Sequence, residues 1–262
     1  MTEIRVSILS YLEKKDFSSI QRLTDAGVLL HLDVMRDPFI KNKNIVEFED
    51  IRRLLKQDLE FLDIHLMVND PFPFLNLVWK NTSLENRKKV RLTYHMEAFR
   101  FQNGKFNEKT YDLKNIKTQD TQLKSTLLAS DKLSKRKLKY ILFVTKALGF
   151  ETGLSIEPST DVNNLEPCLM KHVDLVLCMS VVSGAGGQAF HESVYDKVKK
   201  IKEKYSHVKI QVDGGVKDSE YVNLNKVGVE ETVIGSHITN SNNPIGKYKE
   251  IKNLLNVGGE DN

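Results

Sequence analysis

The sequence predicts an α/β protein in which eight parallel strands close into a (β/α)8 barrel. Short apolar runs rich in β-branched residues alternate with longer amphipathic segments along the 262 residues. This alternation is typical of parallel strands that are joined by right-handed helical crossovers. Eight such units suit a chain of this length, because (β/α)8 barrels contain about 250 residues. Six units would instead have favoured an open doubly wound sheet.

The predicted strands are short and apolar, and each is followed by a segment with helical periodicity. In the sixth helix, for example, apolar residues recur at Val194, Val198 and Ile201, with lysines on the other face. The predicted strands span Arg5–Ser10, Leu29–Val34, Phe61–Val68, Val90–Met96, Glu151–Ile156, Asp174–Ser180, Val208–Val212 and Glu231–Ile234. The predicted helices span Phe17–Ala26, Val46–Leu55, Phe72–Lys80, Lys135–Leu148, Val162–Met170, Glu192–Tyr205, Ser219–Val227 and Pro244–Leu255.

One segment departs from this alternation. Residues 98–134 are polar and lysine-rich, and they follow the fourth strand before any convincing helix. The segment is too long for an ordinary βα loop, so we expect an insertion that forms a solvated decoration; a lid over the active-site face is the alternative. We expect residues 1–262 to form one barrel domain, with this insertion and a polar tail at 256–262.

The composition excludes several classes of protein. Two cysteines, Cys168 and Cys178, cannot provide the disulfide framework of a chain this long. The 39 basic and 35 acidic residues are interspersed, and lysine clusters such as 199–202 and 132–139 read as solvated faces rather than a nucleic-acid surface. No apolar run of about 18 residues is present. We therefore expect a cytoplasmic protein without a nucleic-acid or membrane partner; a homo-oligomer is left open.

Ionisable side chains gather at the ends of three predicted strands. Residues two apart in a strand share a face, so each of these strands presents its polar side chains to the same side. A barrel interior would make unpaired carboxylates costly, and a divalent cation would remove that cost. Imidazoles and carboxylates suit Zn²⁺, Fe²⁺, Mn²⁺ or Co²⁺ without distinguishing them. The residues are His31, Asp33, Asp63, His65 and Asp213.

Glycine-rich segments follow the sixth, seventh and eighth predicted strands. They are residues 179–188, Gly214-Gly215 and Gly235-Ser236. Glycines let backbone N–H groups converge on an anion, and barrels commonly bind phosphate at these strand ends. Three neighbouring segments of this kind predict a phosphate site.

These segments, taken as an ordered set, resemble the D-ribulose-5-phosphate 3-epimerase family over nearly the whole chain apart from the insertion. The resemblance implies a TIM barrel that interconverts D-ribulose 5-phosphate and D-xylulose 5-phosphate. The matching stretches are 7–10, 30–35, 63–68, 95–98, 179–181, 184–188, 212–216 and 235–236.

The resemblance also implies roles for individual residues. One divalent cation would be held by His31, Asp33, His65 and Asp213, and the same two aspartates would serve as acid and base on opposite faces of the substrate, through an enediolate stabilised by the metal. Met35, Met67 and Met179 would line the site. Substrate and phosphate contacts would fall on Ser7, His65, Gly184, Gly186, Gly187, Gly214, Gly215, Gly235 and Ser236.

Three departures from the family pattern leave alternatives open. Arg36-Asp37 replaces an Asp-Gly pair, the sixth loop reads Ser183-Gly184-Ala185 without its proline and aromatic residue, and Glu157 stands at the end of the fifth strand. Divergent loops are compatible with a 3-epimerase of a phosphorylated hexulose, such as allulose 6-phosphate. They are also compatible with a non-catalytic phosphosugar-binding protein on the same scaffold.

Overall fold

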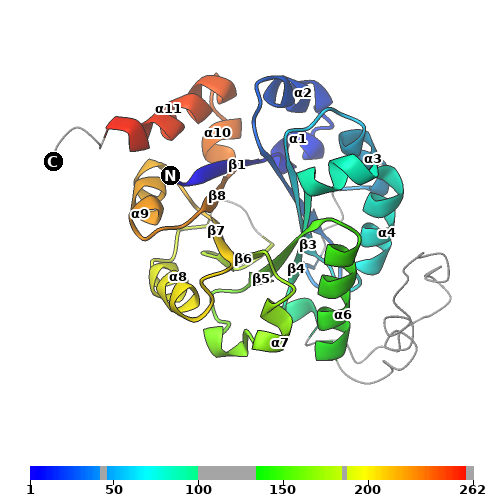
Figure 1. Cartoon of the computed structure of the whole chain (residues 1–262). Helices are drawn as coiled ribbons and strands as arrows, with labels where there is room; N and C mark the ends of the chain where they lie inside the picture. The colour runs from blue at the N-terminus through cyan, green and yellow to red at the C-terminus, as the bar shows by residue number, and fades with distance from the viewer. Residues whose placement is uncertain (42–45, 100–133, 185–187, 258–262) are drawn as a thin grey trace.

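The computed structural model describes residues 1–41, 46–99, 134–184 and 188–257. Its eight parallel strands pair in chain order, and β8 pairs with β1, so the sheet closes into the predicted barrel (Figure 1). The strands are β1 (Glu3–Ser7), β2 (Leu30–Met35), β3 (Leu62–Met67), β4 (Val90–His95), β5 (Glu151–Ile156), β6 (Leu175–Met179), β7 (Lys209–Asp213) and β8 (Glu231–Ile234).

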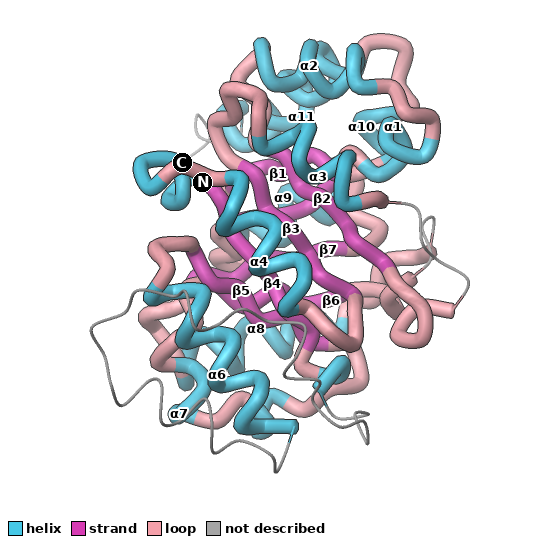
Figure 2. The backbone as a smooth tube through the Cα atoms, turned by 90° about the vertical axis from the view of Figure 1, so that its right-hand side faces the viewer, coloured by secondary structure: helices cyan, strands magenta, loops and turns pink. Residues whose placement is uncertain are grey.

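Helices surround the barrel on the outside, as Figure 2 shows from the side. The α-helices are α1 (Leu9–Glu13), α2 (Phe17–Asp25), α3 (Phe48–Leu55), α4 (Phe72–Asn81), α6 (Ser134–Ala147), α7 (Pro167–Met170), α8 (Ser193–Lys204), α9 (Asp218–Lys226), α10 (Ser236–Thr239) and α11 (Pro244–Val257). Three 3-10 helices are η1 (Leu84–Lys89), η2 (Glu97–Phe99) and η5 (Val162–Asn164).

Each strand presents one face to the helices and the other to the barrel interior. On β2, the outward side chains of Leu30, Leu32 and Val34 belong to the main hydrophobic core, so His31 and Asp33 face inward. The interior is polar on the side of β2, β3 and β4. On β6 the inward side chains, from Leu175 to Met179, form a separate apolar cluster.

Two element predictions are wrong at their boundaries. The first strand ends at Ser7 rather than Ser10, because α1 begins at Leu9 and buries Ile8, Tyr11 and Leu12 at helical spacing. The helix predicted over Val162–Met170 is divided into η5 and α7. Pro167 causes the division, since it forces the residue before it into an extended conformation.

The predicted insertion lies almost entirely outside the described residues. Its first residues, Ala98 and Phe99, are buried in η2, and its last, Ser134, begins α6. The predicted tail begins too early, because α11 continues to Val257. Within the described ranges, the search for a helix long and apolar enough to span a bilayer found none.

Candidate active site

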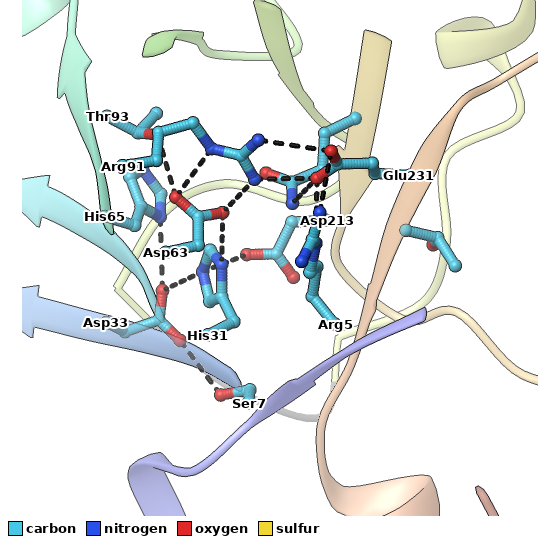
Figure 3. Close-up of polar contacts among 12 residues, drawn as sticks. Arg5, Ser7, His31, Asp33, Asp63, His65, Arg91, Thr93, Asp213 and Glu231 are labelled. Carbon is cyan, nitrogen blue, oxygen red and sulfur yellow. Dashed lines mark hydrogen bonds and ion pairs between the residues drawn. The ribbon is translucent and has the colours of Figure 1, made fainter. Parts of the chain in front are cut away.

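Four ionisable side chains meet inside the barrel at the carboxyl ends of its strands. His31 and Asp33 come from β2, His65 from β3, and Asp213 is the last residue of β7. The β2–β3 register places Asp33 beside His65, and Figure 3 shows the side chains turned toward one another. One donor atom from each of the four lies within 4.8 Å of all the others. The structure therefore brings together all four residues of the predicted metal site.

The spacing of these atoms fits a shared cation. His31 Nε2 lies 3.2 Å from Asp33 Oδ1 and 3.7 Å from Asp213 Oδ2, and His65 Nδ1 lies 3.1 Å from Asp33 Oδ1. Ligands about 2.1 Å from a tetrahedral ion are about 3.4 Å apart, in the middle of this range. The donors are also of the mixed nitrogen and oxygen type that divalent transition metals accept.

The two carboxyl groups differ in their proton affinity. Burial would raise the pKa of Asp33, but His31 and His65 outweigh it and lower this pKa far below the usual value. Burial and the nearby Asp33 charge raise the pKa of Asp213 to about 6. A pair of carboxyl groups whose pKa values are driven apart in this way is suited to act as a base and an acid.

Neighbouring side chains hold and enclose this cluster. Ser7 Oγ donates to Asp33 Oδ2 over 3.1 Å, so β1 fixes the second oxygen of that carboxylate. Met35 and Met67 are register partners at the ends of β2 and β3, and Met179 is the register partner of Asp213. All three methionines are buried, which agrees with the prediction that they line the site.

The predicted phosphate-binding residues lie at the same end of the barrel, where they are described. Gly235 begins α10 just ahead of Ser236, and a Cβ on Gly235 would lie 3.4 Å from Ser7 Cβ. Gly214 directly follows β7, and Gly184 approaches the side chain of Ile40. Gly186 and Gly187 fall outside the described residues.

Gly215 occupies a backbone position that only glycine fits without strain. Its φ is +65°, and a Cβ there would lie 2.8 Å from the carbonyl oxygen of Gln188 and 2.9 Å from the Phe190 nitrogen. Gly27 is a matched control, because its φ is +69° but nothing lies within 4 Å of its Cβ position. We expect Gly27→Ala to cost about 1–2 kcal/mol of folding free energy, the backbone term alone. Gly215→Ala should cost more and raise KM, as measured by urea unfolding and kinetics; equal losses would contradict this.

Sequence reasoning gave no role to a second group of polar side chains beneath the cluster. Asp63 lies 3.0 Å from His31 Nδ1 and pairs with Arg91, and both are fully buried. Burial would raise the pKa of Asp63, but Arg91 and His31 lower it well below the usual value. An arginine at an inward position of an otherwise apolar strand is the signal that could have revealed this pair.

His95 and Glu97 form a further buried pair next to the cluster. The His95 ring stacks on His65 at 4.8 Å, and its Nδ1 lies 3.1 Å from Glu97 Oε2. Glu157 approaches the same imidazole at 3.9 Å and accepts a hydrogen bond from the Ser183 backbone over 3.3 Å. The negative charge of Glu157, noted as a departure, therefore faces the first residues of the glycine-rich loop.

Comparison with known proteins identifies relatives that span most of the chain. The ribulose-phosphate 3-epimerase of Mycoplasma genitalium is 27% identical over 90% of this chain and 91% of its own length. The cytoplasmic isoform from Oryza sativa subsp. japonica is also 27% identical, over 87% of this chain and 85% of its own. These relatives are enzymes named for one reaction.

Solved structures support the fold. The 3-hexulose-6-phosphate synthase of Salmonella typhimurium matches with a TM-score of 0.61 at 12% identity, covering 98% of this chain and 99% of its own. KGPDC from Streptococcus mutans matches with a TM-score of 0.60, also at 12% identity, over 98% of both chains. At this identity the likeness shows the barrel architecture alone.

The family comparison covers both halves of the barrel. The model of the ribulose-phosphate 3-epimerase family matches residues 3–116 and 129–239. The unmatched residues 117–128 lie inside the segment predicted to be an insertion. With the closed barrel, the clustered histidines and aspartates, and relatives that share this name, the match shows that the chain is an isomerase of the ribulose-phosphate 3-epimerase family.

Proposed function

We propose that the protein interconverts D-ribulose 5-phosphate and D-xylulose 5-phosphate by moving a proton at C3. The observation that carries the proposal is the pair of carboxyl groups, Asp33 and Asp213, in one buried cluster with different proton affinities. Inversion at C3 requires one group to remove a proton beside the C2 carbonyl and another to return a proton to the opposite face. Two carboxyl groups at fixed positions do this without turning the sugar.

Each residue of the cluster has a part in this reaction. Asp33, kept ionised by the two histidines, accepts a proton from C3, and Asp213, with its pKa near neutrality, supplies one; the two exchange these tasks in the reverse direction. Ser7 keeps one Asp33 oxygen in place. The three methionines exclude water from the reacting carbon, so protons reach it only from the aspartates.

His31, Asp33, His65 and Asp213 would hold one divalent cation, which supplies positive charge against the oxygen atoms that become negative during the reaction. The donor types suit Zn²⁺, Fe²⁺, Mn²⁺ or Co²⁺. The glycines after β6, β7 and β8, with Ser236, would bind the substrate phosphate through backbone N–H groups. That contact positions the reacting carbon between the two carboxyl groups.

An activity assay coupled to metal analysis tests the proposal. Purified protein should convert D-ribulose 5-phosphate, lose that activity on chelation, and regain it when one of the four cations is returned. Allulose 6-phosphate, assayed in parallel, should be the poorer substrate. A metal-loaded protein that converts neither sugar would contradict the epimerase function and favour a phosphosugar-binding role.

Metal affinity should fall as the pH is lowered below about 6. In the metal-free protein the pKa of Asp213 is about 6, and a cation binds only the ionised carboxylate, so protons compete with it. Despite burial, Asp33 and Asp63 raise the pKa of His31, so binding near neutral pH should also release a proton from its imidazole. Chelator competition across the pH range, with calorimetry in two buffers, measures both effects. A pH-independent affinity would contradict the prediction.

A further inference from the structure

A layer of charged side chains lies in the barrel directly below the metal-ligating cluster. Arg5 from β1, Asp63 from β3, Arg91 from β4 and Glu231 from β8 are all buried there. Arg91 Nη2 lies 2.7 Å from both Asp63 Oδ2 and Glu231 Oε2, and Arg5 Nη2 lies 2.9 Å from Glu231 Oε1 (Figure 3). Two positive and two negative charges therefore balance within the layer.

Asp63 is the member of this layer that touches the cluster above. Its Oδ1 accepts from Arg91 Nε at 3.0 Å and from Thr93 Oγ1 at 3.1 Å. Its Oδ2 accepts from Arg91 Nη2 and faces His31 Nδ1 at 3.0 Å. Both oxygens are thus held by donors on neighbouring strands, so the carboxylate has a fixed orientation.

The contact with Asp63 determines how His31 presents its ring. A carboxylate beside Nδ1 accepts a hydrogen bond, so the proton of a neutral imidazole stays on Nδ1 and the lone pair stays on Nε2. That Nε2 atom is the one facing Asp33 and Asp213. His65 is arranged differently, because its Nδ1 faces Asp33 while its buried Nε2 has no hydrogen-bond partner in the described part of the chain.

We propose that Asp63, held by Arg91 and Thr93, is a positioning residue that directs the His31 lone pair toward the metal. This inference rests on the proposed metal centre. Because the layer below is neutral as a whole, it orients His31 without adding net charge to the site. Carboxylates that accept from the second nitrogen of a metal-ligating histidine commonly contribute 10–100-fold to metal affinity.

Asp63→Asn is the direct test, and Glu231→Gln is its matched control. Both substitutions neutralise a buried carboxylate that pairs with Arg91, but only Asp63 contacts His31. In Asp63→Asn, Zn²⁺ affinity measured by chelator competition should fall about 10–100-fold. The imidazole ¹⁵N resonances of the zinc-loaded protein should lose the single Nδ1–H form of His31. Glu231→Gln should lower Tm while affinity and ¹⁵N pattern are retained.

Thr93→Val provides a milder variant if Asp63→Asn does not fold. It removes one hydrogen bond to Asp63 Oδ1 and keeps the carboxylate, so zinc affinity should fall by less, with the same change in the ¹⁵N pattern. Equal zinc affinity in the wild type and in whichever of these variants folds would overturn the positioning role alone. Absence of zinc binding to the wild type would overturn the metal centre as well.

Discussion

Asp213→Asn is expected to lower the rate of epimerisation by about 10²–10⁴-fold, the usual contribution of one acid–base group. The variant keeps the shape of the side chain but cannot supply or accept the C3 proton. The remaining carboxylate, Asp33, should still exchange the C3 hydrogen of one epimer with solvent deuterium, without inversion. Asp33→Asn should show the same exchange for the other epimer. Proton NMR in D₂O, with each epimer as the starting substrate, measures both activities.

Controls separate proton transfer from loss of the metal or of the fold. Metal content and Tm are measured for each variant, and the exchange experiment uses only metal-loaded protein. Asp58→Asn is a matched surface substitution, since Asp58 is exposed and its nearest cation, Lys89, lies 3.6 Å away. It should leave activity unchanged. Wild-type turnover by metal-loaded Asp213→Asn would exclude this residue as an acid or base.

Arg91→Met is expected to destabilise the fold by about 3–5 kcal/mol, as removing one member of a buried ion pair does. Asp63 and Glu231 would each lose a charged partner at 2.7 Å. Urea unfolding at neutral pH measures the loss. Lys89→Met is the control on the same edge of the barrel; it breaks only an exposed pair and should cost about 1 kcal/mol or less.

The effect of Arg91→Met should depend on pH. Burial would raise the pKa of Glu231, but Arg91 and Arg5 outweigh it and lower the pKa from 4.5 to about 2. A carboxyl group with a lowered pKa stabilises the fold above its unfolded-state value, and this contribution disappears as the pH falls through the folded value. The wild type should therefore lose stability between about pH 4.5 and 2, and the gap to the variant should narrow there. A constant gap would show that lost packing, not charge, causes the destabilisation.

Most of the barrel could be predicted from the sequence, because apolar runs and helical periodicity are local signals. The strands Glu151–Ile156 and Glu231–Ile234 were predicted at their observed bounds. The metal cluster could also be predicted, since the carboxyl ends of parallel strands meet at one end of a barrel. The first strand was predicted too long because Ile8 and Leu9 are apolar in either structure, and only packing of α1 decides between them.

The charged layer could not be predicted in the same way. Arg91 and Glu231 are 140 residues apart in the chain, and their contact depends on the register of several strands together. Asp63 shares a strand face with His65, which places it inside the barrel but does not show that it turns toward His31. Pairings of this kind follow from the assembled barrel rather than from any single segment.

The buried charges also bear on how the barrel selects the alignment of its last strand. Closure brings β8 against β1 with Glu3 opposite Glu231, at opposite ends of the sequence. A slip of β8 by one residue would turn Glu231 toward the helices and bring Thr232 inside. Both arginines would then be enclosed without this carboxylate. Misaligned closure therefore carries a heavy electrostatic penalty, and the fold gains a discrimination among registers that an all-apolar interior would lack.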